Sequence, residues 1–111
     1  MRRLGGFVVL LIWVWGMGIG CRQGRVERGR IVFRQKCAHC HTVGRGKRMG
    51  PDLKGVTKRW EGKALRAWLV DPDAVYRERG RRPINPKFSP MPRVTLTPEE
   101  VADLLAYLSS I

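Results

Sequence analysis

The chain opens with an uninterrupted apolar run. Arg2 and Arg3 precede residues 4–20, which contain no charged side chain and number 17 in all. A short positive segment followed by an apolar run is typical of a secretory signal. A run of this length is also at the lower limit for a helix that spans a bilayer. Residues 1–20 are therefore predicted to be a signal peptide or an N-terminal membrane anchor.

The C-terminal segment has the clearest helical pattern. Thr97-Pro98-Glu99-Glu100 reads as a capping box, with Thr97 as N-cap, Pro98 in the first helical position and Glu100 in the third. One apolar stripe follows at helical spacing: Val101, Leu104, Leu105 and Leu108. The acids Glu99, Glu100 and Asp103 lie in or near the first turns, where they suit the helix dipole. The segment is predicted to be the terminal helix.

Two further segments indicate helices, at residues 26–36 and 62–70, and Asp71-Pro72 marks the end of the second. The side chains expected to face inward are Val26, Ile31 and Phe33 in the first segment, and Leu65, Trp68 and Leu69 in the second. The stretch from Tyr76 to Pro92 is rich in Arg and Pro and is expected to be a polar loop. Because no segment alternates as a strand does, the predicted class is all-α.

Length and charge narrow the possibilities. The 111 residues indicate one domain. Without the leader 111 − 20 = 91 residues remain, and a domain of that size usually needs a disulfide, metal or cofactor to stabilise its thin core. There are 22 Lys and Arg against 9 Asp and Glu. Without Arg2 and Arg3 the net charge is 20 − 9 = +11. Such a charge would favour binding to an anionic membrane or an acidic protein, or it would serve only to keep the protein soluble. Because the protein is expected to be exported, nucleic acid is not expected as its partner.

The first of three cysteines lies where the leader ends. Cys21 follows Gly18-Ile19-Gly20, which partly resembles the lipobox of a bacterial lipoprotein, with Gly18 where that family favours Leu. Acylation of Cys21 would supply two lipid chains, enough for stable anchoring. The alternatives are an uncleaved anchor helix, in which Cys21 is incidental, and simple secretion. We expect residues 21–25 to be a short tether, and the protein to be anchored on the periplasmic side of a bacterial cell envelope.

The other two cysteines lie in Cys37-Ala38-His39-Cys40-His41. Cys-x-x-Cys-His is the attachment sequence for c-type haem, in which two thiols add to the vinyl groups of the ring. His41 is then the proximal iron ligand. A thioredoxin-like redox motif would need a βαβ context, and a zinc site would need four ligands, yet no Cys or His follows His41. His39 is expected to face solvent.

The sixth iron ligand is expected to be Met91. No later histidine is available, and the methionines beyond the leader are Met49 and Met91. Met49 is eight residues from His41, which would keep it on the proximal side. Met91 is fifty residues away and lies between Pro90 and Pro92, which stiffen its loop. His/Met ligation raises the haem potential. The alternative is a core methionine beside an open or water-bound iron.

Together these motifs resemble a class I c-type cytochrome domain over residues 26–111. The matching positions are Gly29 and Phe33 before the haem motif, Leu104 and Tyr107 on the last helix, Gly50-Pro51-Asp52-Leu53, and Pro90-Met91-Pro92. The resemblance implies a cytochrome c-like fold around one covalent haem c, with its N- and C-terminal helices crossing at Gly29. It also implies that the Pro51 carbonyl orients His41. The loop 76–88 matches no pattern of the family.

The predicted function is transfer of single electrons by a carrier that is not an enzyme and has no small-molecule substrate. Apolar side chains such as Leu53, Trp68 and Leu69 would wrap the haem, with iron bound by His41 and Met91. Basic residues near the motif and the Met91 loop would steer docking onto acidic redox partners, an attraction that weakens as salt rises. These residues are Lys36, Arg45, Lys47, Arg48, Lys87 and Arg93. Alternatives are a docked subunit of a membrane oxidoreductase and a haem-based sensor with a labile sixth ligand.

Overall fold

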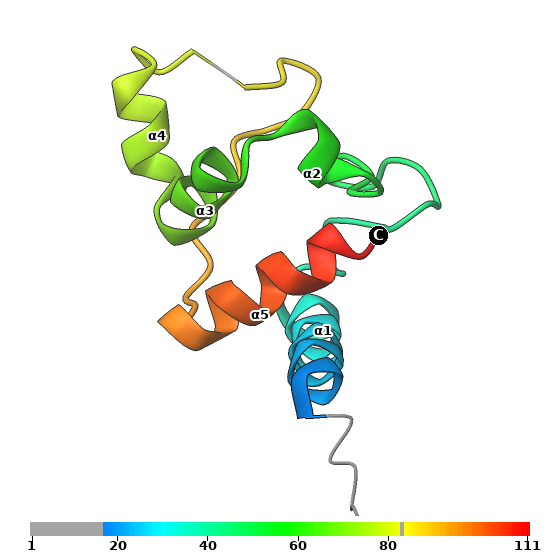
Figure 1. Cartoon of the computed structure of the whole chain (residues 1–111). Coiled ribbons are helices and arrows are strands. Elements are labelled where there is room, and N and C mark those ends of the chain that lie inside the picture. The colour runs from blue at the N-terminus through cyan, green and yellow to red at the C-terminus, as the bar shows by residue number, and fades with distance from the viewer. Residues whose placement is uncertain (1–16, 83) are drawn as a thin grey trace, which may run out of the picture.

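The computed structural model describes residues 17–82 and 84–111 (Figure 1). Most of the predicted leader, residues 1–16, lies outside the described residues. The elements in chain order are α1 (Met17–Lys36), α2 (Val56–Arg59), α3 (Gly62–Val70), α4 (Pro72–Glu78) and α5 (Pro98–Ser109). No strand occurs in these described ranges, and the predicted all-α class is confirmed.

Helices α1 and α5 cross in direct contact, as predicted (Figure 1). A Cβ atom added to Gly29 of α1 would meet the Asp103 carbonyl and lie 2.7 Å from Cβ of Tyr107. Only a glycine lets the two backbones approach this closely. One turn later, the rings of Phe33 and Tyr107 pack with their centroids 5.5 Å apart.

The inward face of α1 differs from the prediction. Ile31 is 51% exposed and Val26 is only half-buried, whereas Val32 and Phe33 belong to the core. Because a residue two positions from Gly29 and Phe33 points to the opposite side of a helix, Ile31 cannot share their face. The helix also begins before residue 26 and runs through residues 21–25, the segment predicted to be a tether. In the part of the chain that the structure describes, no helix has both the length and the apolar character needed to span a bilayer.

Helix α3 has the predicted bounds, and Leu65 and Leu69 are buried. The segment after it differs from the predicted polar loop. Asp71 ends α3 and also caps α4, because its side chain accepts a hydrogen bond from the backbone N–H of Ala74 at 3.1 Å. Pro72 then takes the first turn of α4, so Tyr76 is helical. The short helix α2 was also not predicted.

Helix α5 has the predicted capping box: Oγ1 of Thr97 accepts from the Glu100 N–H, and Oε1 of Glu100 accepts from the Thr97 N–H. Asp103 also makes contacts that were not predicted. Its buried carboxylate lies 3.6 Å from Nε of Arg25 and 3.4 Å from Nε of Arg28, both on α1. These ion pairs tie the middle of α1 to α5.

Candidate functional site

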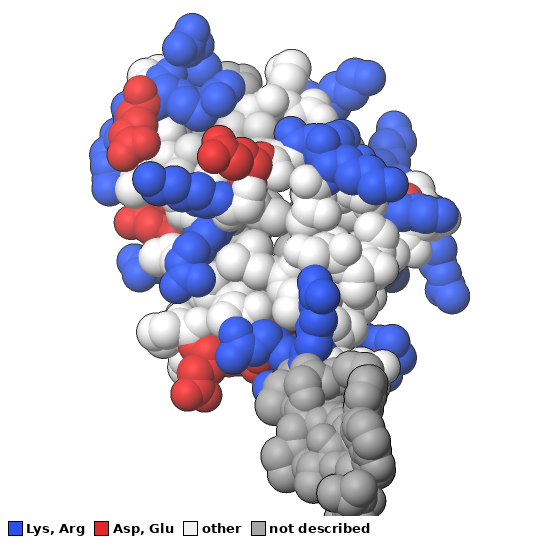
Figure 2. All heavy atoms as spheres, in the orientation of Figure 1, with Lys and Arg blue, Asp and Glu red and all other residues white. Residues whose placement is uncertain are grey.

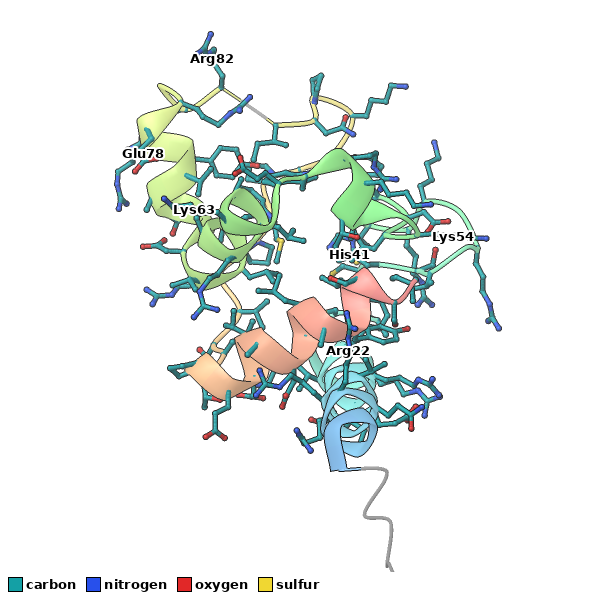
Figure 3. The ribbon with its side chains drawn as sticks, viewed as in Figure 1. Arg22, His41, Lys54, Lys63, Glu78 and Arg82 are labelled. Carbon is teal, nitrogen blue, oxygen red and sulfur yellow. The ribbon has the colours of Figure 1, made fainter. Side chains whose placement is uncertain are left out.

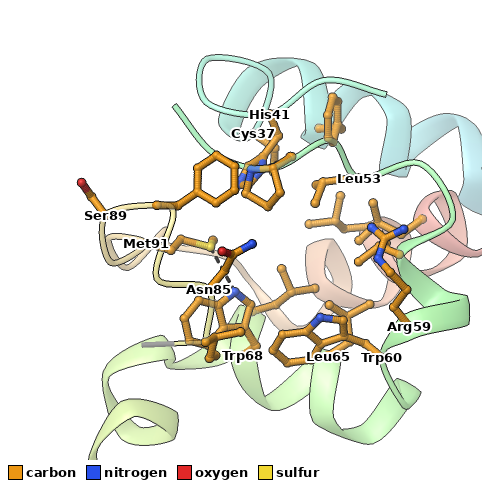
Figure 4. Close-up of a pocket in the computed structure, with 18 of the residues that line it drawn as sticks. Cys37, His41, Leu53, Arg59, Trp60, Leu65, Trp68, Asn85, Ser89 and Met91 are labelled. Atoms are coloured by element: carbon orange, nitrogen blue, oxygen red, sulfur yellow. Dashed lines mark hydrogen bonds between the residues drawn. The ribbon is translucent and has the colours of Figure 1, made fainter. Parts of the chain in front are cut away.

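A cavity of about 290 Å³ lies in the middle of the helical assembly (Figure 4). Its walls come from the end of α1, residues 51–60, helix α3, Tyr76, residues 84–91 and helix α5. The lining is mainly apolar and includes core side chains such as Leu65, Leu69, Leu104 and Leu108. The hydrophobic core is thus built around a space rather than filled by side chains.

The haem motif continues α1 by one turn. The N–H of Cys37 donates to the Phe33 carbonyl at 2.8 Å, and the N–H of His41 donates to the Cys37 carbonyl at 2.9 Å. This turn buries Cys37, leaves Cys40 half-buried and exposes His39. Burial, followed by repulsion from Cys40, raises the pKa of the Cys37 thiol to about 11. The position therefore favours an uncharged sulfur, which a thioether also provides.

His41 lies against the loop that follows the motif. Its Nδ1 atom is 2.9 Å from the carbonyl oxygen of Pro51. Since a carbonyl only accepts, Nδ1 must carry the hydrogen, and Nε2 keeps its lone pair for a metal. The neighbouring Gly50 packs flat on the ring, because a Cβ there would lie 2.5 Å from Cε1 of His41. Both residues thus fix the orientation of the imidazole.

Asp52 holds that loop in shape. Its Oδ1 accepts from the N–H groups of Gly44 at 2.8 Å and Lys54 at 2.9 Å, and Oδ2 accepts from Gly46 at 2.9 Å. These backbone donors, Gly44 first, lower the pKa of the Asp52 carboxyl below its usual value. Nothing in the sequence indicated this role for Asp52, which is only the variable position of the Gly50–Leu53 stretch.

Met91 contributes its thioether to the cavity, whereas Met49 is 66% exposed and does not line it. The indole Nε1 of Trp68 donates a hydrogen bond to Sδ of Met91 at 3.2 Å (Figure 4). Trp68, expected to be simply inward, is half-buried and also packs edge-on against Tyr76, with ring centroids 5.2 Å apart. The Met91 thioether is therefore positioned by a hydrogen bond from an aromatic side chain that also lines the cavity.

Several residues of the cavity were not predicted from the sequence. Arg59 is the one cation of its lining within the described residues, and its guanidinium donates to the carbonyls of Lys54 at 2.9 Å and Asp52 at 3.3 Å. Trp60 lies beside it (Figure 4). Tyr76, Ile84 and Phe88 also line the cavity, although they lie in the stretch predicted to be a polar loop.

The six basic residues predicted to steer docking differ in their surroundings. Lys36 is engaged within the fold, because its Nζ donates to the Thr95 carbonyl at 2.7 Å and lies 3.1 Å from Oε2 of Glu100. Arg48 donates to the Ala38 carbonyl at 2.7 Å, beside the haem motif. The remaining four are exposed: Arg45, Lys47, Lys87 and Arg93. Figure 2 shows basic side chains spread over the viewed face, with fewer acidic ones among them.

The cavity fits a haem. Its lining offers the thiol of Cys37, an imidazole, a thioether, an apolar surface and a single cation, and Cys40 lies three residues after Cys37 in the same turn. Imidazole and thioether are donors that haem iron accepts, and an apolar surround suits the ring. A guanidinium suits the carboxylates at its periphery.

Comparisons with known proteins agree with this fit. The sequence model of the family described as cytochrome c matches residues 26–111. The chain belongs to the cytochrome c family. It is 33% identical over 89 residues to a cytochrome c-553-like protein of Synechocystis, covering 80% of this chain and 71% of the relative. It is 30% identical over 107 residues to cytochrome c of Cannabis sativa, covering 77% and 88%.

Solved structures agree as well. A cytochrome c domain from Pseudomonas putida superposes with a TM-score of 0.65 at 33% identity, covering 74% of this chain and 85% of that one. Cytochrome c from Rhodothermus marinus gives a TM-score of 0.62 at 21% identity, covering 79% and 77%, which supports the fold alone.

Family membership confirms the predicted cofactor and chemistry. Members bind one covalent haem c through Cys-x-x-Cys-His, and this sequence occurs in the chain once, at Cys37–His41. The cofactor of this cytochrome is therefore one haem c. Its activity is electron transfer, and it is a carrier rather than an enzyme.

Proposed function

We propose that this cytochrome is an anchored one-electron carrier of a bacterial cell envelope. In this proposal Cys37 and Cys40 form the thioethers, and Nε2 of His41 and Sδ of Met91 bind the iron. The observation that carries it is that His41 and Met91, fifty residues apart in the chain, both line one apolar cavity beside Cys37. When bound, the haem supplies a one-electron redox couple.

Residues of the chain would hold the two iron ligands in place, so that the ligands stay the same in the oxidised and the reduced state. The carbonyl of Pro51 keeps the hydrogen of His41 on Nδ1, so that Nε2 stays available. The indole of Trp68 holds the Met91 thioether. Leu53 and Leu69 line the cavity and exclude water from it. Arg59, fixed to two backbone carbonyls, presents a positive charge at its edge.

The membrane part of the proposal rests on the leader and on Cys21. We propose attachment to the outer face of the cytoplasmic membrane, through acylated Cys21 or through an uncleaved N-terminal helix. Mass spectrometry of the membrane-extracted protein separates the two. A diacylated N-terminal Cys21 supports the first, residues 1–20 in place support the second, and a soluble form without lipid contradicts both.

Partner recognition would use the exposed basic residues near the haem motif and the Met91 loop, namely Arg45, Lys47, Lys87 and Arg93. Because exposed charges are screened by salt, electron transfer with an acidic partner should slow as ionic strength rises. A rate that does not depend on salt would contradict this part of the proposal. A docked subunit of a membrane oxidoreductase would transfer the same electron, and co-purification with a larger complex would distinguish it from a free carrier.

The decisive experiment is the visible spectrum of the purified holoprotein, oxidised and reduced, with carbon monoxide then added to the reduced form. We expect a low-spin spectrum with methionine–iron charge transfer in the oxidised state and no response to carbon monoxide. The Met91→Ala variant should lose the charge-transfer band, bind carbon monoxide and have a lower potential. Met49→Ala is the matched control and should behave as the native protein. A native protein that binds carbon monoxide would favour a haem-based sensor.

A further inference from the structure

The end of helix α4 is a hydrogen-bonded turn that carries four arginines. The N–H of Arg81 donates to the Tyr76 carbonyl at 2.7 Å, and the N–H of Gly80 donates to the Arg77 carbonyl at 3.1 Å. With φ of 65° at Gly80, this is the Schellman arrangement that terminates many helices. Nε of Arg82 donates to the Arg79 carbonyl at 3.0 Å, which fixes the stem of that side chain as well.

The charge at this turn is concentrated and unpaired. Residues 77–82 hold four arginines and one acid, Glu78, and all four arginines are exposed. In the part of the chain that the structure describes, none of the four forms a salt bridge. Figure 2 shows the basic side chains gathered over the end of α4. Cations near a helix C-terminus interact favourably with the helix dipole. That effect is confined to the last turn and does not account for four arginines.

The turn lies far from the point where the chain enters the described part of the molecule. In Figure 1 the start of α1 is at the bottom and the end of α4 is at the top, with α5 and α3 between them. Figure 3 shows Arg82 pointing away from the body at that upper end. A membrane attachment at or before Cys21 therefore leaves these arginines remote from the lipid headgroups around it.

A series of packed side chains connects the turn to the cavity. Tyr76, directly before Arg77, is half-buried and lines the cavity. Its ring meets the indole of Trp68, and Trp68 donates to Sδ of Met91 at 3.2 Å. A molecule bound at the turn would thus lie one short chain of contacts from the thioether.

We propose that Arg77, Arg79, Arg81 and Arg82 form a docking surface for the carboxylates of an acidic protein partner. This site is separate from the basic residues beside the haem motif, and it rests on the proposed carrier function and membrane attachment. The guanidinium fork binds carboxylates in a bidentate manner, and a turn already closed by backbone hydrogen bonds has less backbone freedom to lose on binding. Anionic lipid is the weaker candidate because the surface faces away from the predicted anchor.

The test uses the full-length holoprotein in nanodiscs of phosphatidylcholine and soluble poly-L-glutamate as the acidic probe, with binding measured by calorimetry. The variant Arg77→Gln/Arg79→Gln/Arg82→Gln removes three charges and keeps Gly80 and Arg81, which form the turn. The control, Arg34→Gln/Lys54→Gln/Lys58→Gln, removes three exposed charges elsewhere. We expect the arginine variant to bind about tenfold more weakly than the control, or about 1.4 kcal/mol, in line with three exposed ion pairs.

Equal affinities of the two variants would overturn the proposal. Repeating the comparison in nanodiscs that contain phosphatidylglycerol should leave the tenfold ratio intact. A ratio that falls to one on these discs would assign the surface to lipid headgroups instead. The reduction potential and the low-spin spectrum are measured on every variant. A native protein without that spectrum, or one that does not enter nanodiscs, contradicts the proposed function. Unequal binding with an unchanged spectrum supports the docking surface.

Discussion

At the scale of single residues, the geometry around His41 depends on an atom that no side-chain mutation removes, the carbonyl oxygen of Pro51. Gly50 is the accessible point of intervention, because its Cα packs on the imidazole ring. The Gly50→Ala substitution would force the ring away from the Pro51 carbonyl. We expect a shifted reduction potential and an altered oxidised spectrum. Gly62→Ala, where an added Cβ meets nothing within 4 Å, should change neither. An unchanged potential in Gly50→Ala would show that the ring tolerates the displacement.

Asp52 gives a residue-scale prediction about pH. Its pKa in the folded protein lies below the ordinary value of 3.8, chiefly because the Gly44 N–H donates to it. The carboxylate therefore stabilises the fold fully above pH 3.8, and this contribution is lost as the pH falls through the lower folded-state pKa. The Asp52→Asn variant should unfold at lower denaturant concentration at neutral pH, and the difference from the native protein should shrink below pH 3.8. A difference that stays constant with pH would contradict this role.

Site residues could be predicted from the sequence where their types and spacing match a known cofactor site. Residues whose roles depend on the shape of a folded loop could not. Cys37, His41 and Met91 could be singled out because their residue types and separations match one cofactor. Asp52 and Arg59 could not, since their partners are backbone groups that meet only after the loop has folded. The Trp68–Met91 hydrogen bond likewise joins residues 23 apart in the chain, and no local pattern indicates it.

At the scale of helices, the crossing of α1 and α5 provides the sharpest prediction. Gly29→Ala would drive a methyl group into the backbone of α5, and overpacking of this kind costs about 1–3 kcal/mol or more. Gly24 is the matched control on the same helix, because its added Cβ would meet only the mobile end of Arg28 at 3.3 Å. Gly24→Ala should stabilise the protein by about 0.5–1 kcal/mol through helix propensity. Denaturant unfolding of both variants checks the opposite signs, and equal signs would contradict the crossing.

Helix boundaries were predictable where the sequence contains a start or stop pattern. Thr97-Pro98 gave the start of α5, and Asp71-Pro72 gave the end of α3. The same dipeptide also starts α4. That helix was not predicted, because Asp71-Pro72 was taken only as the end of α3. Helix α2 has four residues, too few for any periodic pattern. Ile31 was assigned to the wrong face of α1, because the helix packs on α5 through Gly29 and Phe33 and Ile31 lies two positions from both.

At the scale of the whole molecule, the core encloses the cofactor cavity, so haem attachment and folding should be coupled. Without the haem, Leu65, Leu104 and the other core residues of the lining lack a common partner. The variant Cys37→Ala/Cys40→Ala should lose cooperative thermal unfolding and near-ultraviolet circular dichroism. Cys21→Ala leaves the haem motif intact and should retain both. Native-like unfolding of the double variant would show that the helices pack without the cofactor.

Helix α1 also sets a length. Cys37 lies 16 positions after Cys21, and the helical rise over that interval is about 24 Å. The ion pairs of Asp103 with Arg25 and Arg28 tie the middle of this helix to α5. When Cys21 carries the lipid, the length of the helix limits the distance between the membrane and the haem. The haem attachment point then lies no more than about 24 Å from the anchored residue. Such a carrier searches for partners by diffusing in two dimensions, and it can serve only those whose electron entry or exit points lie within that height of the bilayer.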